Sequence, residues 1–394
     1  MSRLLIIGAS ILQLPAIKKA KELGHYVAVA DYNPQAIGIA YADEYFNAST
    51  IDINAITDVA KHFRPDGIMT LATDMPMRSI AAATAALGLP GISMETAIKA
   101  TDKGAMIKAF NECGVAAPWY YIVESKVELQ SIAQKLTYPC IIKPTDNAGS
   151  RGVILVEDCF QLENAYDYSH AQSRGGHVIV EEYMRGHEVS VEVMVVDKDI
   201  HILAVTDKLT TGAPFFVEMG HSQQSILSAD DIRKIKSLTK EAILAIGINN
   251  GPAHVEIMLT ETGPKMIELG ARMGGDCITT HLVPLSTGID MIKATIDVAL
   301  GIMPDILPKF NKGSAIRYIN VQAGRVMSVE GIDSAKSVEG IKDVFVQVQP
   351  NDIISNIHSS LDRAGFVIAQ GQTADEAVSR CNQALSLIKI KITK

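Results

Sequence analysis

The sequence contains no apolar run of the roughly 18 residues that a helix needs to cross a bilayer. Its first residues, MSRLLIIGASILQLPA, place an arginine before an apolar stretch, as a signal peptide does. Because LLIIGAS is followed by the amphipathic AIKKAKELG, we interpret this region as a buried strand that turns into a helix. The sequence therefore predicts a protein without a membrane partner.

Cysteine is also scarce, and its pattern excludes two classes of protein. The five cysteines are far apart in the sequence, odd in number and form no CxxC pair; they are Cys113, Cys140, Cys159, Cys277 and Cys381. A disulfide framework or a zinc site would require paired or closely spaced cysteines. We therefore expect reduced thiols in a cytoplasmic protein.

Positive charge is in short supply as well. The formal net charge is −8 and the isoelectric point is near 5.7, whereas binding to a nucleic-acid backbone depends on clustered Lys and Arg. Nucleic acid is therefore excluded as the main partner. Low-complexity segments are missing too, and 47% hydrophobic with 20% charged residues is typical of a globular chain. A chain of 394 residues is too long for one ordinary core, so we expect two or three domains.

The first hundred residues alternate short apolar strands with helical segments, beginning with RLLIIGAS, a helix over 13–23 and HYVAVAD. This alternation predicts a parallel sheet covered by helices on both faces. The first strand-to-helix turn, Gly8-Ala9-Ser10, followed by Asp31 after the second strand, invites comparison with dinucleotide-binding folds. The chain has no GxGxxG motif, which argues against that reading. A helix N-terminus above such a sheet is still a suitable place for an anionic substrate group.

The rest of the chain mixes helices with strands at hairpin spacing. A helix is predicted over 96–114, with Lys103 in its first turn, and further helices over 229–247 and 277–299. From about residue 305 the pattern is rich in strands, and it closes with a helix over 373–388 and a short strand.

A glycine-rich loop follows Lys143 and reads TDNAGSRG, ending at Gly152. Small residues let backbone amides approach phosphate oxygens, and the nearby lysine supplies charge. The segment is no Walker A motif, because a strand (VILV) and not a helix comes after it. The pattern indicates either a phosphate-binding hairpin tip or an ordinary hairpin loop.

A run of acidic residues stands where an apolar strand ends. Glu181 and Glu182 follow VIV, and Glu188 lies a few residues further on. A strand end that leaves the core exposes backbone N–H and C=O groups that can bind an adenine, and a nearby carboxylate can accept from ribose hydroxyls. The alternative is that the three glutamates are simply solvated charges.

Residues 254–272, HVEIMLTETGPKMIELGAR, have the alternation and the central turn of a β-hairpin. Glu256 and Glu268 are equidistant from Thr262 in the turn, so a symmetric register places the two carboxylates opposite each other. Facing like charges destabilise a strand pair unless a metal cation, a basic side chain or water offsets them. Mg²⁺ prefers one or two carboxylates together with phosphate oxygens and waters. The period also brings Gly270 and Arg272 to the face of Glu268.

These segments, in this order and spacing, resemble the ATP-grasp superfamily of carboxylate-amine ligases. The resemblance covers nearly all of residues 1–300, and the last ninety residues resemble the C-terminal domain of the L-amino-acid ligase branch and of biotin carboxylase-like relatives. It implies a multidomain protein of α/β and α+β class with an ATP-grasp fold. The implied parts are a Rossmann-like pre-ATP-grasp domain over 1–100, an ATP-grasp domain over 101–304 with a lid subdomain at about 115–187, and a small C-terminal α+β domain over 305–394.

The resemblance also implies roles for individual residues. Lys103 and Lys143 would contact the phosphates of ATP beneath a loop formed by Gly149, Ser150, Arg151 and Gly152. Adenine would meet the strand end at Glu181, Glu182 and Met184, ribose would meet Glu188, and Mg²⁺, or Mn²⁺ as a second candidate, would bind Glu256 and Glu268. Arg272, with Lys143 as the second catalytic residue, would stabilise the phosphorylated intermediate.

The chain departs from the family pattern in one place. Many relatives have Asn two residues after the second glutamate, where this chain has Gly270, so the resemblance does not decide between one and two metal ions. The implied reaction is attack of a carboxylate on the γ-phosphate of ATP, followed by attack of an amine on the acyl phosphate.

The substrates are small molecules whose identity the sequence leaves open. Glu218 and His221 lie in PFFVEMGHSQQS, which resembles an acceptor segment of amino-acid ligases, although a structural histidine fits equally well. Gly274 and Gly275 precede a predicted helix that could hold a carboxylate. Rival readings are a phosphoribosylglycinamide synthetase-like or carbamoyl-phosphate synthase-like ligase and a non-catalytic ATP-binding regulator. A homodimer is a candidate assembly.

Overall fold

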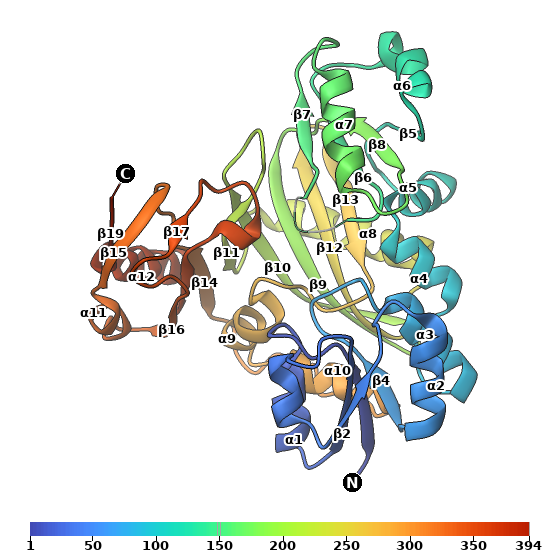
Figure 1. Cartoon of the computed structure of the whole chain (residues 1–394), viewed down its shortest axis with the longest axis vertical. Coiled ribbons are helices and arrows are strands. Elements are labelled where there is room, and N and C mark those ends of the chain that lie inside the picture. The colour runs from blue at the N-terminus through green and yellow to red at the C-terminus, as the bar shows by residue number, and fades with distance from the viewer. Residues whose placement is uncertain (148, 150, 394) are drawn as a thin grey trace.

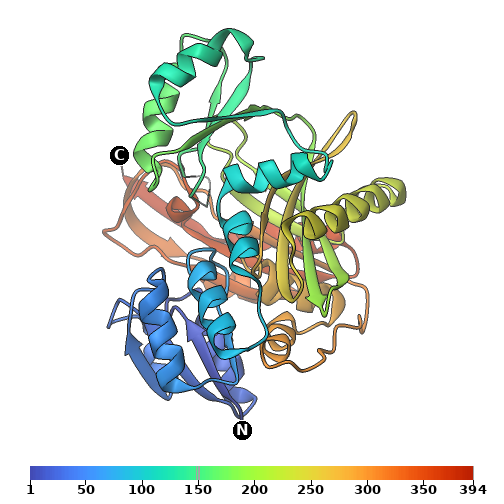
Figure 2. The same ribbon diagram turned by 90° about the vertical axis from the view of Figure 1, so that its right-hand side faces the viewer.

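A computed structural model describes residues 1–147, 149 and 151–393, and its strands within these ranges form four sheets (Figure 1). The N-terminal segment lies at one end of the molecule and a small sheet lies at the other. A large central sheet runs between them, and the C-terminal segment lies to its side (Figures 1 and 2). Among the described residues, no helix combines the length and the apolar character needed to span a membrane.

The N-terminal sheet is parallel, in the order β3-β2-β1-β4, as the alternation of strands and helices predicted. Its strands are β1 (Arg3–Ile7), β2 (Tyr26–Asp31), β3 (Glu44–Asn47) and β4 (Gly67–Met69), and its helices are α1 (Leu14–Glu22), α2 (Ile53–Phe63) and α3 (Met77–Leu87). Apolar residues of β1 and β2 point alternately into two different core clusters, one shared with α1 and one with α2 and α3. Both clusters continue into the central sheet, so the N-terminal segment is packed firmly against it.

The single helix predicted over 96–114 is wrong, because the chain forms two helices there. They are α4 (Met94–Thr101) and α5 (Lys103–Glu112), and they meet at Asp102, whose backbone is extended (φ −128°, ψ 115°). The carboxylate of Asp102 accepts a hydrogen bond from the backbone N–H of Ala105 and so caps α5. Lys103 is therefore the first residue of a helix.

The small sheet has the order β5-β8-β6-β7 and covers one end of the central sheet (Figure 1). It consists of β5 (Tyr120–Val123), β6 (Cys140–Pro144), β7 (Ile154–Val156) and β8 (Val178–Glu182), with α6 (Lys126–Ile132) and α7 (Leu162–Gln172). The expected hairpin on either side of the glycine-rich loop is present, since β6 and β7 pair antiparallel.

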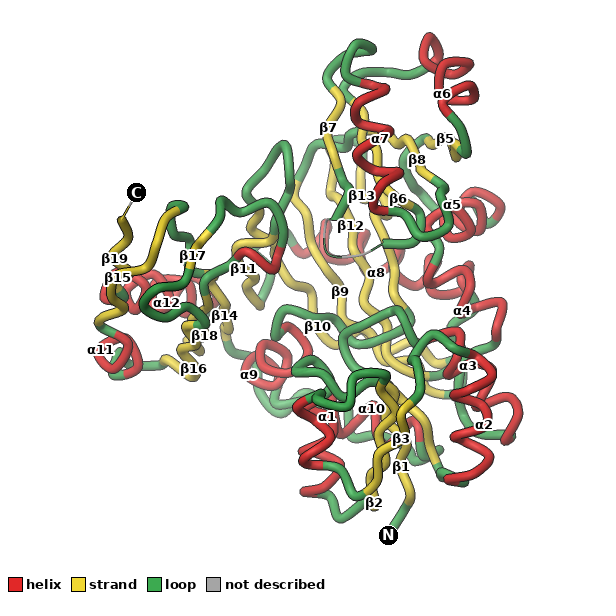
Figure 3. The backbone as a smooth tube through the Cα atoms, viewed as in Figure 1, coloured by secondary structure: helices red, strands yellow, loops and turns green. Residues whose placement is uncertain are grey.

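The central sheet has eight strands within the described chain, in the order β13-β12-β9-β10-β11-β14-β18-β16 (Figure 3). The strands are β9 (His187–Val196), β10 (Asp199–Thr210), β11 (Glu218–Gln223), β12 (Gly251–Thr260), β13 (Gly263–Gly270), β14 (Gly313–Tyr318), β16 (Ile341–Val346) and β18 (Gly365–Gly371). Helix α8 (Ala229–Ile246) lies within one residue of its prediction over 229–247 and packs against this sheet. The last three strands come from the C-terminal segment, so this segment continues the sheet.

The helix predicted over 277–299 is interrupted. A π-helix (Ile278–Leu282) leads into α9 (Val283–Thr287), which ends at Gly288 with φ 78°, and α10 (Met291–Ala299) starts after the capping residue Asp290. The C-terminal segment adds α11 (Ile332–Lys336), α12 (Ala374–Leu387) and a three-stranded sheet of β15 (Gly324–Glu330), β17 (Ile353–Ile354) and β19 (Lys389–Thr393). The closing helix and strand agree with the prediction. The domain boundaries at 100 and 304 stay predictions.

Candidate active site

Glu256 and Glu268 face each other across β12 and β13, as predicted, but the pairing does not run in one register along the hairpin. Near the two-residue turn, Thr260 pairs with Gly263 and Ile257 with Met266, and in this register Glu256 would face Ile267. A register shift between Glu256 and Ile257 leaves Ile267 without a partner and moves Glu268 opposite Glu256. The pairing of the two carboxylates therefore depends on this bulge.

Basic side chains offset the repulsion between the two carboxylates. Lys103 at the start of α5 places its Nζ 3.1 Å from Glu268 Oε1, and Lys208 on β10 places its Nζ 3.2 Å from Glu256 Oε2. His254 Nε2 lies 3.2 Å from Glu256 Oε1. The sequence left open whether a metal cation, a basic side chain or water offsets the repulsion, and the structure shows basic side chains beside both carboxylates.

Lys208 is a central residue that the sequence analysis missed. Its side chain is only 3% exposed and also contacts Glu188 at 2.5 Å and Glu218 at 3.7 Å. Burial alone would lower the pKa of Lys208, but these carboxylates together with Glu256 outweigh it and hold the pKa well above its usual value. The available signal was a lysine near the end of the apolar strand IHILAVTDK.

His254 is the second missed residue. Its Nδ1 lies 2.7 Å from Oε1 of Glu192, which is fully buried on β9. Burial would lower the pKa of His254, yet the charge and hydrogen bond of Glu192 and the bond to Glu256 raise it to about 9. His254 is therefore a cation at neutral pH. For Glu256 burial acts in the opposite direction and would raise the pKa, but the charges and hydrogen bonds of Lys208 and His254 hold the pKa of Glu256 well below its usual value.

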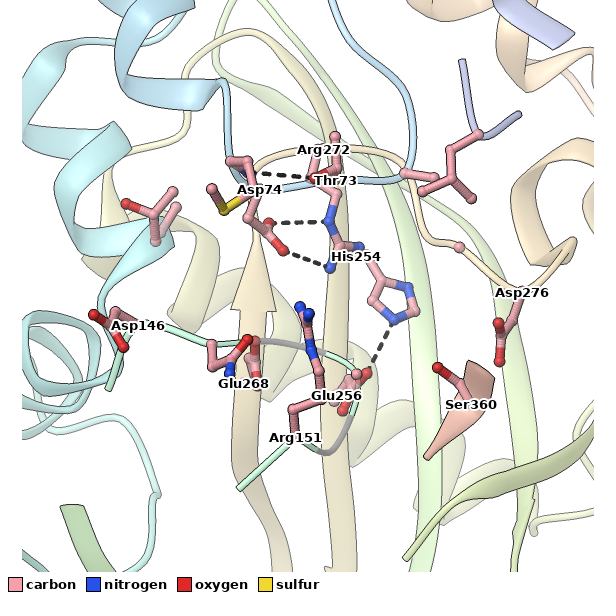
Figure 4. A pocket seen from close by; sticks show the side chains of 18 of the residues that line it. Thr73, Asp74, Asp146, Arg151, His254, Glu256, Glu268, Arg272, Asp276 and Ser360 are labelled. Carbon is pink, nitrogen blue, oxygen red and sulfur yellow. Dashed lines mark hydrogen bonds and ion pairs between the residues drawn. The ribbon is translucent and has the colours of Figure 1, made fainter. Parts of the chain in front are cut away.

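Arg272 forms a bidentate ion pair with Asp74 from the loop between β4 and α3, with Nε–Oδ1 at 2.9 Å and Nη2–Oδ2 at 3.0 Å (Figure 4). Both side chains are largely buried, at 13% and 18% exposure. Asp74 also lies where a residue larger than glycine at position 270 would project, because a Cβ on Gly270 would come 2.8 Å from Asp74 Oδ1. The departure at Gly270 is thus matched by a carboxylate from another part of the chain.

The glycine-rich loop lies beside these charges. Lys103 Nζ donates to the carbonyl of Asn147 at 2.7 Å, so one lysine connects the loop with Glu268. Gly149 and Gly152 have φ of 69° and 80°, conformations that other residues adopt only with strain. Gly152 packs against a proline of β6. Gly149 and Arg151 line two cavities, one of about 200 Å³ and one of about 730 Å³, that are described below. Ser150, which was predicted for the same loop, is outside the described residues.

A cavity of about 200 Å³ lies between the small sheet and the central sheet. The predicted nucleotide residues line it; they are Lys143, Glu181, Glu182, Met184 and Glu188. The three glutamates are not solvated charges. Glu181 contacts Lys143 at 2.6 Å, Glu182 contacts Lys265 at 2.8 Å, and Glu188 contacts Lys208.

The residues present suit a magnesium ion held jointly with phosphates. Two carboxylates supply hard oxygen donors, and Mg²⁺ accepts such a pair when phosphate oxygens and waters complete its octahedron. The described residues contain no cluster of three or more His, Cys, Asp or Glu that would hold a metal by themselves.

Comparison with known proteins finds two matching domain families. Residues 136–280 match the family described as "ATP-grasp domain", and residues 317–393 match "L-amino acid ligase C-terminal domain 2". The chain contains an ATP-grasp domain. A relative named alanine–anticapsin ligase, from Bacillus subtilis (strain 168), is 26% identical over 314 residues, which are 74% of this chain and 66% of the relative.

Several solved structures cover the whole chain, among them the following two. A phosphoribosylglycinamide synthetase from Anaerococcus prevotii has a TM-score of 0.80 at 26% identity, with all of both chains covered. An L-amino acid ligase from Bacillus licheniformis has a TM-score of 0.86 at 22% identity, with 100% of this chain and 99% of that chain covered. These likenesses show that the fold is that of ATP-grasp proteins. The chain spans just under two thirds of the length of the first curated relatives that it matches, 64% to 66%.

A larger cavity of about 730 Å³ lies on the side of the N-terminal segment, and Glu256, Glu268 and Arg272 are part of its lining. The lining also includes the predicted substrate residues Glu218, His221 and Gly275. Gly274 is not among the residues that line this cavity, and a Cβ there would come 2.6 Å from His254 Nδ1. The predicted helix after these glycines is a five-residue π-helix. This π-helix continues directly into α9, and binding of a substrate carboxylate at its start stays a prediction.

Arg363, from the C-terminal segment, was not found by sequence reasoning because only the fold brings it to the site. It forms a bidentate pair with Asp276 at 2.7 and 2.8 Å, and its guanidinium carbon lies 3.7 Å from the ring centroid of Tyr318. Asp276 Oδ2 is also 3.3 Å from Nε2 of His221, which is only 2% exposed. Burial would raise the pKa of Asp276, but hydrogen bonds from Arg363 and His221 hold it well below its usual range.

Proposed function

We propose that this protein is an ATP- and Mg²⁺-dependent ligase that activates a carboxylate as an acyl phosphate and couples it to an amine, with an amino acid on at least one side. The proposal depends above all on Glu256 and Glu268, which face each other where the two cavities meet. Both cavities share these carboxylates with Lys103, Lys208 and Arg272. A nucleotide in the smaller cavity and a substrate in the larger one would thus meet at this point.

The smaller cavity would hold ATP. The backbone at Glu181 and Met184 would bind adenine, and Glu188 would accept from the ribose hydroxyls. Lys143 is buried beside Glu181 and would supply positive charge to the phosphates, together with Lys103 and the loop at Gly149. Carboxylates pair with these lysines in the described chain, and phosphate oxygens would compete for the same N–H donors.

Glu256 and Glu268 would hold Mg²⁺, which neutralises charge on the transferring phosphoryl group when it is bound. Mn²⁺ is a second candidate. In the first step a substrate carboxylate oxygen attacks the γ-phosphorus and ADP leaves. In the second step an amine attacks the acyl carbon, inorganic phosphate leaves and the amine loses a proton. Arg272 would donate to the phosphoryl oxygens during both steps, oriented by Asp74.

The decisive test is Glu268→Gln, with Glu261→Gln in the exposed turn of the same hairpin as a matched control. We expect Glu268→Gln to abolish Mg²⁺-dependent ADP release while the circular dichroism spectrum is unchanged, and Glu261→Gln to keep full activity. Full activity of Glu268→Gln would refute the proposal.

Two rival functions are separated by the substrates that stimulate ADP release. Pairs of amino acids favour the proposed ligase, whereas phosphoribosylamine with glycine, or bicarbonate, favours the synthetase-like alternatives. ATP binding without turnover under every carboxylate would favour a non-catalytic regulator. We also propose a division into domains at 1–100, 101–304 and 305–394 and a cytoplasmic location. The proposed assembly is a homodimer, and gel filtration with light scattering would check its mass.

A further inference from the structure

The larger cavity has an apolar side that the proposed chemistry does not use. Leu12, Ile51, Ile53 and Met75 line it from the N-terminal segment, and Leu361 lines it from the C-terminal segment. Their exposed fractions are 48%, 54%, 38%, 37% and 78%, in that order. Large apolar side chains that line one cavity and remain exposed mark a site for an apolar ligand group.

Four of these side chains come from one edge of the N-terminal sheet. Leu12 follows β1, Ile51 and Ile53 follow β3, and Met75 follows β4. The strands are parallel, so all three loops lie at the carboxyl end of the sheet, the edge where open α/β folds bind ligands. Met75 is adjacent to Asp74, the partner of Arg272, so the apolar side begins next to the reaction centre.

Three N–H groups of the turn after β1 are already bound within the chain. Ala9 N donates to Asp31 Oδ2 at 2.8 Å, Ser10 N to Gln13 Oε1 at 3.2 Å, and Leu12 N to Ser10 Oγ at 3.2 Å. The carboxylate of Asp31 therefore occupies the place that an anion would need. An anionic substrate group at the start of the following helix stays a prediction.

The same cavity also holds positive charge. Arg78 and Arg174 line it, and the Arg174 guanidinium contacts the sulfur of Met75. Apolar and cationic groups thus lie side by side, which suits a molecule with both a carboxylate and an apolar side chain. A volume of about 730 Å³ is ample for such a molecule beside the transferring phosphates.

We propose that one substrate is an amino acid with a large apolar side chain, such as leucine, methionine or phenylalanine, and that Leu12, Ile51, Ile53 and Met75 determine this specificity. The inference rests on the proposed function and deepens it. It excludes a phosphorylated sugar amine as the substrate held at this edge of the sheet.

Calorimetric binding tests this without turnover. The full chain is loaded with Mg²⁺ and a non-hydrolysable ATP analogue and titrated with L-leucine, L-phenylalanine, L-aspartate, L-lysine and ribose 5-phosphate. We expect leucine or phenylalanine to bind at least about tenfold more tightly than the charged probes, since one or a few methylene contacts distinguish ligands by this factor or more. Tighter binding of aspartate, lysine or ribose 5-phosphate, or no binding of any amino acid, would overturn the inference.

Kinetics with the best amino-acid pair then tests the residues. Ile53→Glu and Leu12→Glu should raise KM for the apolar substrate at least about tenfold, with kcat changed less than threefold and KM for ATP unchanged. Leu244→Glu, on the exposed face of α8, is the matched control and should behave like the parent. Unaltered KM in both test variants would refute their role.

The two levels of the argument fail in different ways. If ADP is released with polar amino acids as well as with apolar ones, the specificity inference is wrong and the ligase proposal stands. If the protein binds ATP but releases ADP with none of the carboxylate and amine pairs, the ligase proposal is wrong.

Discussion

The side chain of Asp74 and the missing side chain of Gly270 occupy one space, and this leads to a quantitative prediction. A Cβ at position 270 would lie 2.8 Å from Asp74 Oδ1 and 3.1 Å from the guanidinium carbon of Arg272. Gly270→Asn alone should therefore force the ion pair apart. Overpacking of a well-packed site costs about 1–3 kcal/mol, and we expect about 2 kcal/mol.

Asp74→Ala alone should be costly for another reason, because it leaves the buried guanidinium of Arg272 without its carboxylate. Breaking a buried ion pair from one side costs about 3–5 kcal/mol, and we expect about 3 kcal/mol. In the double variant the overlap with Asp74 disappears and the amide oxygen of Asn can accept from Arg272. The double variant should thus be about 2 kcal/mol more stable than the sum of the two single losses predicts.

Denaturant unfolding of the parent, both single variants and the double variant measures this coupling, with Mg²⁺-dependent ADP release as the second readout. Gly275→Asn is the control for the unfolding measurement alone, because a Cβ there meets nothing within 4 Å but Gly275 lines the larger cavity. The single variants should lose activity on the order of a hundredfold through displacement of Arg272, and the double variant should recover part of it. If the unfolding free energies lost in the two single variants add up to the loss in the double variant within about 0.5 kcal/mol, Asp74 and the side chain at position 270 do not share one space.

Two further predictions follow from the neighbouring strands and loops. Gly274→Ala should lower the free energy of unfolding by about 1–3 kcal/mol, because its Cβ would overlap His254, whereas Gly275→Ala should change it by less than about 0.5 kcal/mol; thermal unfolding of both variants checks this. Arg363→Met should destabilise the protein most at neutral pH. The pKa of Asp276 is held low in the folded state, so the pair stabilises above about pH 4, and the difference from the parent should narrow as the pH falls below that value. A difference that widens at acidic pH in denaturant titrations would contradict this pairing.

Local patterns in the sequence were sufficient for much of the fold. The period of two around Glu256 and Glu268 predicted a hairpin with opposed carboxylates, and alternating strands and helices predicted the parallel N-terminal sheet. The bulge at Ile267 was not predictable from the period, since strand alternation does not show where a single residue loses its cross-strand partner.

The sequence failed where partners come from distant parts of the chain. Asp74 and Arg272 are 198 residues apart, and Asp276 and Arg363 are 87 residues apart, so only the folded chain brings them together. The helix predicted over 96–114 failed for a local reason. Asp102 offers its carboxylate to the next turn, which favours a new helix start over a continuous helix.

The continuity of the central sheet has a consequence for attempts to shorten this protein. Strands β14, β18 and β16 extend the sheet beyond β11, and β11 pairs directly with β14 from Gly220 to Gln223. A fragment ending at residue 312 would leave β11 as an open edge whose unpaired N–H and C=O groups can template pairing with other chains. Such a fragment should form aggregates during expression, and any trimming for crystallisation is better made at loop tips than between β11 and β14.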